Sequence, residues 1–166
     1  REGFSVAVIG DSWVANGKLD GPLADALREN GIRATVISFG DPGAKSKRIY
    51  ANLVGQGKPS HSSHRILSDP GVRYCIIIAG VNDVMARIGK DFYAYHTYAL
   101  CQTLRDSGIR VFALEIPEFG TEVQLEVPWY VRYGKLPLYG LLFEEEGDGL
   151  ESYRRAFLDR LDAEGL

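Results

Sequence analysis

Apolar residues fall along this chain in two alternating patterns: short continuous runs, and longer stretches with an apolar residue every three or four positions. The short runs cover 4–9, 34–39, 72–79 and 110–116, and each predicts a strand. The first of them is typical of a strand buried on both faces of a sheet. The periodic stretches predict helices over 19–30, from about 44 to 53, over 91–107 and over 151–163.

Strands that alternate with helices need crossover connections, which favour a mostly parallel sheet between two helix layers. The predicted fold class is therefore α/β, a three-layer α/β/α sandwich with a flavodoxin-like sheet, and residues 1–166 form a single domain with the first strand near its centre. The apolar residues expected on the buried faces of the last two helices are Phe92, Tyr95, Leu100 and Leu104, then Tyr153, Phe157, Leu158 and Leu161.

Between Pro117 and Gly147 the alternation stops for about thirty residues. This stretch is rich in aromatic residues: Phe119, Trp129, Tyr130, Tyr133, Tyr139 and Phe143. Two interpretations stand side by side, an irregular segment that packs its aromatics on the core and a lid that contacts substrate.

Composition narrows the class of protein. Charged residues make up 25% of the 166 residues and the formal net charge is -3, without a basic block, so nothing indicates a nucleic-acid partner. No apolar run approaches the roughly 20 residues of a membrane span, and the chain reads as soluble. Because it opens on Arg1, a removed leader stays open; the cytoplasm is favoured, with secretion or the periplasm as the alternative. Cys75 and Cys101 are read as buried thiols.

Three strand ends hold the candidate chemistry. Ligands bind beyond the carboxyl ends of parallel strands, and there the sequence has Gly10-Asp11-Ser12-Trp13, a glycine loop through Gly40 and Gly43, and Gly80-Val81-Asn82-Asp83. Each motif alone has an ordinary structural explanation, since such residues also make turns and helix caps. Together they supply a hydroxyl, a backbone donor free of side-chain obstruction and an amide donor, which are the parts of an acyl-transfer site.

These three blocks resemble those of the SGNH hydrolases, the GDSL esterase and lipase superfamily, over residues 4–117. The resemblance implies that Ser12 is the nucleophile, and that Gly43, Asn82 and the Ser12 backbone N–H bind an oxyanion. It further places three residues at the substrate crevice: Asp11, Trp13 and Asp83. Asp11 would also shape the turn, and Asp83 would fix the loop or the start of the next helix.

The base that should activate the serine is missing from the sequence. The family supplies it from an Asp-x-x-His motif in its last block, and His61, His64 and His96 all lie too early, where a solvated loop or a packed helix surface explains them better. Either the chain lacks its C-terminal strand and that block, because 161–166 resembles the end of the preceding helix, or 148–151 is a degenerate block with Glu151 in place of histidine.

The expected function is hydrolysis of carboxylic esters, plausibly as a carbohydrate O-deacetylase, with a small-molecule or carbohydrate ester as partner and no metal or organic cofactor. The alternative is a catalytically impaired module of the same kind that binds a carbohydrate or acyl ligand. A receiver or flavodoxin domain is disfavoured, because the first strand is not followed by paired acidic residues or a phosphate-cradling loop. The oligomeric state is left open.

Overall fold

A computed structural model describes residues 3–86, 88–116 and 149–165 of the chain. Four strands form one parallel sheet in the order β2-β1-β3-β4. They are β1 (Phe4–Gly10), β2 (Ala34–Gly40), β3 (Val72–Ile78) and β4 (Arg110–Ala113). The first strand is interior, as predicted, and its last five residues are all buried.

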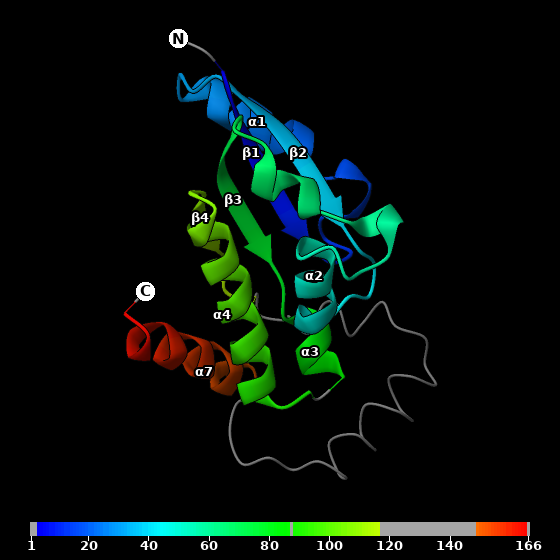
Figure 1. The fold of residues 1–166 in the computed structure, drawn as a ribbon, viewed down its shortest axis with the longest axis vertical. Helices are drawn as coiled ribbons and strands as arrows, with labels where there is room; N and C mark the ends of the chain where they lie inside the picture. Colours follow the sequence, from blue (N-terminus) through cyan, green and yellow to red (C-terminus); the bar gives the residue numbers. More distant parts are fainter. Residues whose placement is uncertain (1–2, 87, 117–148, 166) are drawn as a thin grey trace.

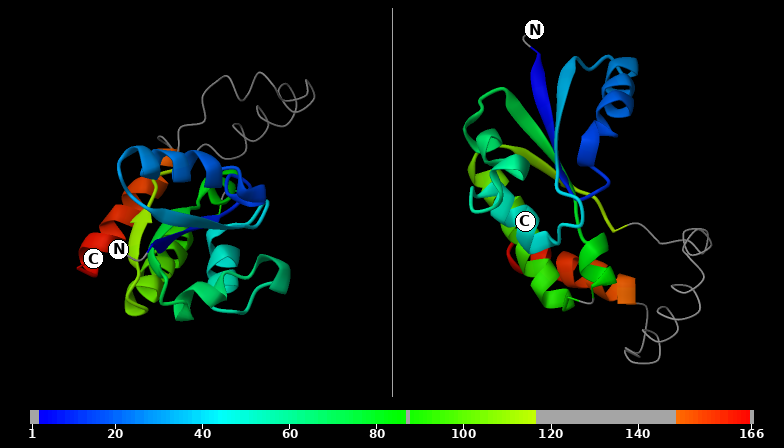
Figure 2. Two further views of the ribbon diagram at one scale, coloured as in Figure 1. Left: turned by 90° about the horizontal axis from the view of Figure 1, so that it is seen from above. Right: turned by 90° about the vertical axis from the view of Figure 1, so that its right-hand side faces the viewer.

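Helices cover both faces of this sheet. They are α1 (Asp20–Glu29), α2 (Ser46–Leu53), α3 (Val81–Met85), α4 (Lys90–Asp106) and α7 (Gly149–Ala163). Short 3-10 turns span Ala15–Gly17, Pro59–His61 and His64–Ser68. Figures 1 and 2 show α1 on one side of the sheet and α2 and α4 on the other, with α7 packed against α4. The predicted three-layer α/β/α architecture is confirmed.

The main core lies between the sheet and the layer that contains α2 and α4. Alternate residues of β1 and β3 point into it and meet apolar residues of both helices and of α7; among the largest are Ile9, Leu53, Ile77, Leu100, Leu104 and Phe157. Cys75 and Cys101 are buried free thiols in this core, as expected. Burial raises the pKa of the Cys101 thiol to about 11, although the nearby Arg105 charge acts in the opposite direction.

The buried face of α4 agrees with the prediction in part. Leu100 and Leu104 are buried as predicted, whereas Phe92 and Tyr95 are 40% and 54% exposed. The stripe that faces the core runs through Tyr93, Thr97, Leu100 and Leu104. These positions follow helical spacing, but Thr97 is polar, which hid the stripe from a reading based on apolar residues. On α7 the prediction that Leu158 is buried is wrong. Leu158 follows the buried Phe157 in the helix and is 48% exposed.

Two predicted element ends were also displaced. The fourth strand stops at Ala113 rather than Ile116, and α2 begins at Ser46, two residues later than expected. The aromatic stretch over 117–147, for which two interpretations were given, lies outside the described residues.

Candidate active site

The carboxyl ends of β1, β2 and β3 meet at one edge of the sheet. Gly10 at the end of β1 is opposite both Gly40 of β2 and Ile78 of β3. In Figure 1 the arrowheads of these three strands point toward α2 and α3. The Asp41 N–H donates to the Gly10 carbonyl (2.9 Å), which ties the segment after β2 to the end of β1. The three loops predicted to hold the site therefore start side by side.

Glycine is required at two of these strand ends by close approach. A Cβ on Gly10 would lie 2.3 Å from the Ile78 carbonyl oxygen, and one on Gly40 would lie 2.2 Å from the Ala15 nitrogen. Both distances are far inside van der Waals contact with backbone atoms. The glycines thus let the turn after β1 pack directly against the neighbouring strands.

The turn after β1 presents Ser12 at the surface. Asp11 shapes it from below: one side-chain oxygen accepts the Trp13 N–H (3.0 Å), and its carbonyl accepts the N–H groups of Val14 and Ala15 (both 3.1 Å). Ser12 and Trp13 are exposed, whereas Asp11 is fully buried. The hydroxyl is therefore open to solvent, and no hydrogen bond joins it to another described residue.

Asn82 connects the other two loops to this turn. Its Nδ2 donates to the Asp11 carboxylate (3.1 Å) and to the Ala44 carbonyl (3.0 Å). The residue before Ser12 and the residue after Gly43 are thus held by one amide, which brings the three predicted catalytic residues into one neighbourhood. The same two bonds use both hydrogens of the amide, a consequence that sequence reasoning did not foresee.

Asp83 holds the start of α2. Its carboxylate accepts the Ser46 N–H (2.9 Å) and the Ser46 hydroxyl (2.6 Å), and the side chain is fully buried. Asp83 was expected to fix its own loop or the start of the next helix, and it holds instead the start of α2, which precedes it in the chain. Asp11 and Asp83 were also expected at the substrate, but neither has surface to offer it, so the structure gives both a supporting position.

Burial raises the pKa of both carboxyl groups. For Asp11 the hydrogen bond from Trp13 opposes the shift and the charge of Asp83 adds to it; for Asp83 the hydrogen bonds from Ser46 oppose it. Both buried carboxyl groups are therefore easier to protonate than a carboxyl group in water.

A tight turn carries Gly43. The Ala44 N–H donates to the Asp41 carbonyl (2.9 Å), Pro42 occupies the second position, and Gly43 has a φ of 72°. These are the features of a type II β-turn, in which the third residue needs a positive φ and is glycine for that reason. Gly43 is exposed, and its N–H has no acceptor among the described residues.

A charged network behind this turn was not anticipated from the sequence. Arg48 of α2 donates through Nε and Nη2 to the two side-chain oxygens of Asp41 (both 2.7 Å) and through Nη2 to the Pro42 carbonyl (2.8 Å). Asn52 donates to the same carboxylate (2.9 Å). Burial alone would raise the pKa of Asp41, but the hydrogen bonds from Asn52 and Arg48, with the charge of Arg48, lower it. The Asp-Pro-Gly sequence is the only signal that could have drawn attention to this turn.

None of the three histidines contacts Ser12 in the described part of the chain. His61 lies with Nε2 3.9 Å from Asp41, His64 is hydrogen-bonded to the Leu53 carbonyl (3.0 Å), and His96 is buried in α4 with Nδ1 against the Phe92 carbonyl (2.8 Å). Glu151 lies in the first turn of α7, 3.7 Å from Arg154. Asp148 of the supposed degenerate block lies outside the described residues.

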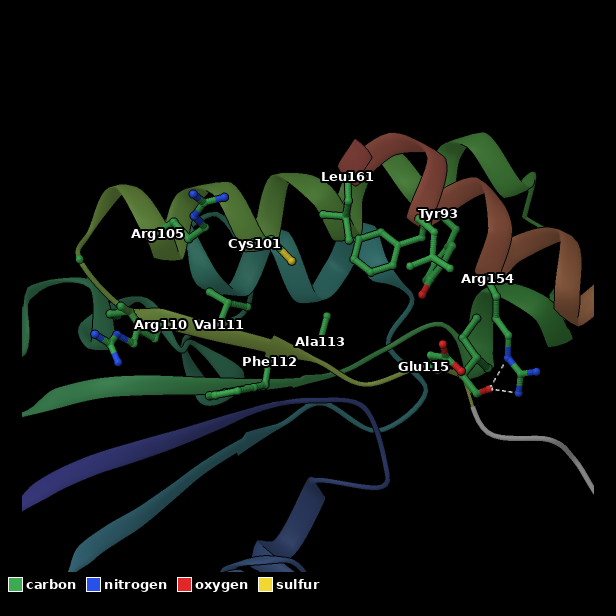
Figure 3. Close-up of a pocket in the computed structure, with 15 residues that line it drawn as sticks. Tyr93, Cys101, Arg105, Arg110, Val111, Phe112, Ala113, Glu115, Arg154 and Leu161 are labelled. Atoms are coloured by element: carbon green, nitrogen blue, oxygen red, sulfur yellow. Dashed lines mark hydrogen bonds between the residues drawn. The ribbon is translucent and has the colours of Figure 1, made fainter. Parts of the chain in front are cut away.

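A cavity among the described residues lies elsewhere. It measures about 760 Å³ and lies between β4, α4 and α7. Figure 3 shows Val111 and Ala113 on one side of it and Cys101 and Leu161 on the other. At its end Arg154 donates to the Ile116 carbonyl through Nε (3.0 Å) and Nη2 (2.5 Å). None of the predicted site residues lines it, so the candidate site lies outside this cavity.

The described residues contain no group of three or more His, Cys, Asp or Glu side chains arranged to hold a metal ion. None of the helices they form is both long and apolar enough to cross a bilayer.

Comparison with known proteins identifies the fold class. No family model matches the chain, and neither does any curated protein. Among solved structures, the chain is similar to TesA (20% identity, TM-score 0.63, covering 97% of this chain and 74% of that one). It is also similar to the psychrotrophic esterase EstA from Pseudoalteromonas sp. (12%, 0.62, 96% and 72%) and to AlinE4, an SGNH-hydrolase family esterase (18%, 0.58, 98% and 83%).

These similarities establish the architecture of the chain. At identities of 12 to 20% they show a shared fold, and that fold is the one of the GDSL and SGNH hydrolases. The resemblance seen in the three sequence blocks is thereby confirmed at the level of the fold.

Proposed function

We propose that this chain is a serine hydrolase of carboxylic esters with Ser12 as its nucleophile. The observation that supports the proposal best is the pair of Asn82 hydrogen bonds, which gather the turn of Ser12 and the turn of Gly43 at one edge of the sheet. Ser12 is exposed there beside backbone donors that have no acceptor among the described residues. Ester chemistry is inferred from the esterases that share the fold.

The oxyanion formed when Ser12 attacks an ester carbonyl would be bound by the N–H groups of Ser12 and Gly43. Removing one such donor costs roughly 10²- to 10³-fold in rate in enzymes where it has been tested. Asn82 would join them by exchanging one of its present acceptors, Asp11 or Ala44, for the substrate oxygen. Trp13, exposed next to the nucleophile, would contact the acyl or alcohol group of the substrate.

The general base that would activate Ser12 has two candidate sources, and neither is hydrogen-bonded to Ser12 in the described part of the chain. One is an Asp-x-x-His block, if the protein continues beyond Leu166 with such a motif, and the other is the degenerate block at 148–151, which has Glu151 in place of histidine. A longer form with such a block should turn over p-nitrophenyl acetate at a rate that its His→Ala variant loses. Loss of activity on Glu151→Gln in the 166-residue chain would favour the second source.

Covalent labelling tests the nucleophile directly. A fluorophosphonate should label the chain once, at Ser12, and Ser12→Ala should abolish both labelling and ester hydrolysis. Ser107→Ala is the matched control, because Ser107 is also an exposed serine but lies at the end of α4. Labelling that persists in Ser12→Ala would remove Ser12 from the proposed role.

A second candidate function is a non-catalytic module that binds a carbohydrate or acyl ligand in the same crevice. It is favoured by one observation, the lack of a hydrogen bond between Ser12 and any described histidine or carboxylate. The same labelling experiment separates the two functions, because an inert serine would ignore the fluorophosphonate. Among esters, an O-acetylated carbohydrate is the substrate we propose, and release of acetate from acetylated xylan would test it.

A further inference from the structure

The turn that carries Gly43 has one peptide group whose orientation decides where its donor points. Turns of type I and type II differ mainly by a rotation of about 180° of the peptide between their two central residues, here Pro42 and Gly43. In the type II form Gly43 has a positive φ, as observed at 72°, and in the type I form its φ is negative. A rotation of this one group would carry the Gly43 N–H to the opposite side of the turn.

Arg48 is bonded to the other end of that same peptide group. Its Nη2 donates to the Pro42 carbonyl (2.8 Å) while Nε and Nη2 also grip the Asp41 carboxylate (both 2.7 Å). A peptide unit is planar, and in a trans unit the carbonyl and the N–H point in opposite directions. The described residues have no cis peptide bond. Holding the Pro42 carbonyl therefore fixes the Gly43 N–H on the side away from Arg48.

We propose that Arg48 is a positioning residue, which locks the Pro42–Gly43 peptide in the type II orientation so that the Gly43 N–H is presented to the oxyanion. The inference rests on the function proposed above for Gly43. Arg48 itself touches no reacting atom in this scheme.

The lock is anchored to the strand that ends at the nucleophile. Asp41 is only 6% exposed in its side chain, and its N–H is bonded to the Gly10 carbonyl, two residues before Ser12. Asn52 holds the same carboxylate from α2. Arg48 thus fixes the Pro42 carbonyl relative to the Asp41 carboxylate, and Asp41 is itself hydrogen-bonded to β1 through its backbone N–H.

The bond from Arg48 has a second effect on the donor. A cation that donates to a carbonyl polarises the whole peptide group, and chains of hydrogen bonds strengthen one another in this way. The Gly43 N–H should therefore be a stronger donor to a developing negative charge than an ordinary backbone amide. Position and donor strength both depend on one side chain that is 47% exposed.

An NMR measurement tests the lock without relying on activity. In a type II turn the Hα of Pro42 lies close to the amide proton of Gly43, and in a type I turn it does not. We expect a strong nuclear Overhauser effect between these protons in the native chain and a clearly weaker one in Arg48→Met. Arg48→Lys keeps the positive charge beside Asp41 but lacks the planar, forked guanidinium that bonds to both Asp41 oxygens and the Pro42 carbonyl at once. For this variant we expect an Overhauser signal of intermediate strength. An unchanged signal in both variants would overturn the proposal.

Kinetics provide the second readout. Arg48→Met should lower kcat for p-nitrophenyl acetate, or the rate of fluorophosphonate labelling, by about 10- to 100-fold with KM changed less than about twofold. Arg28→Met is the matched control, because Arg28 makes a similar 2.8 Å contact with Asp25 on the exposed side of α1. A rise in KM with kcat unchanged, or an equal loss of kcat in the control, would refute the positioning role.

The two proposals fail in different ways. If neither the native chain nor any form extended beyond Leu166 hydrolyses esters or reacts with the fluorophosphonate, the proposed function is wrong, while the Overhauser measurement still decides whether Arg48 locks the turn. If the native chain is active and Arg48→Met is equally active with a weakened signal, the function stands and the inference about Arg48 is wrong.

Discussion

Asn82→Ala is the substitution that tests the architecture of the crevice most directly. The side chain donates to the buried Asp11 carboxylate at 3.1 Å and to the Ala44 carbonyl at 3.0 Å. A hydrogen bond to a charged group contributes about 1.5 to 3 kcal/mol and a neutral one about 0.5 to 1.5 kcal/mol. Because Asn82 is half-buried and water can partly replace it, we expect a loss of about 2 to 4 kcal/mol in the free energy of unfolding.

Urea denaturation followed by circular dichroism measures this loss. With a slope of about 2 kcal/mol per molar for a chain of this size, the midpoint should fall by about 1 to 2 M. Asn30→Ala is the matched control, because Asn30 makes a single bond from Nδ2 to the Ala26 carbonyl (2.9 Å) at the exposed end of α1, and it should cost less than about 0.5 kcal/mol. Equal midpoints for the two variants would refute the reasoning that Asn82 binds the strand ends together.

Three further outcomes are expected. Gly40→Ala should destabilise the chain by about 1 to 3 kcal/mol or more and slow labelling of Ser12, since its Cβ would meet Ala15 backbone atoms at 2.2 and 2.4 Å. Gly31→Ala is the control that isolates the cost of a positive φ, because the Cβ added there meets nothing within 4 Å. A smaller loss of stability for Gly40→Ala than for Gly31→Ala would contradict the packing argument. The raised pKa of Asp83 means that its stabilising contribution is full below 3.8 and is lost as pH rises through the raised value, so Asp83→Asn should flatten the fall of stability over that range in pH-dependent melting; an unchanged slope would exclude Asp83 as its source. Cys101, with a pKa of about 11, should resist a thiol-specific disulfide reagent at pH 8 until the chain unfolds, and rapid labelling of the native chain would contradict its burial.

The strands and the site neighbourhood were predictable because they depend on local signals. Four runs of apolar residues gave four strands, and parallel strands bring their carboxyl ends together whatever the rest of the chain does. Ser12, Gly43 and Asn82 could therefore be assigned to one edge of the sheet from the sequence alone. The glycines at 10 and 40 were visible as turn residues, although the backbone atoms that exclude a Cβ there were not.

The register of α4 was less predictable, since aromatic residues occur on several sides of its first half, at 92, 93, 95 and 98. Tyr93 and Phe92 are adjacent and equally apolar to a periodicity argument, yet only Tyr93 is buried. Tyr93 is buried because it packs against Tyr153 and Phe157 of α7, and such tertiary contacts cannot be predicted from the local sequence. Arg48 was overlooked for the same reason, because its acceptors are chosen by the fold of the preceding turn.

The bonds that join Asn82 to Asp11 and to Ala44 span 71 and 38 residues of sequence, and those from Ser46 to Asp83 span 37. Contacts of such long range form only after the intervening loops have closed, which is entropically costly until neighbouring strands are already aligned. We therefore expect this edge of the sheet to assemble late in folding, so that a partly folded chain would have Ser12 without its surroundings. Reactivity at this edge of the sheet would report on completed assembly of the fold.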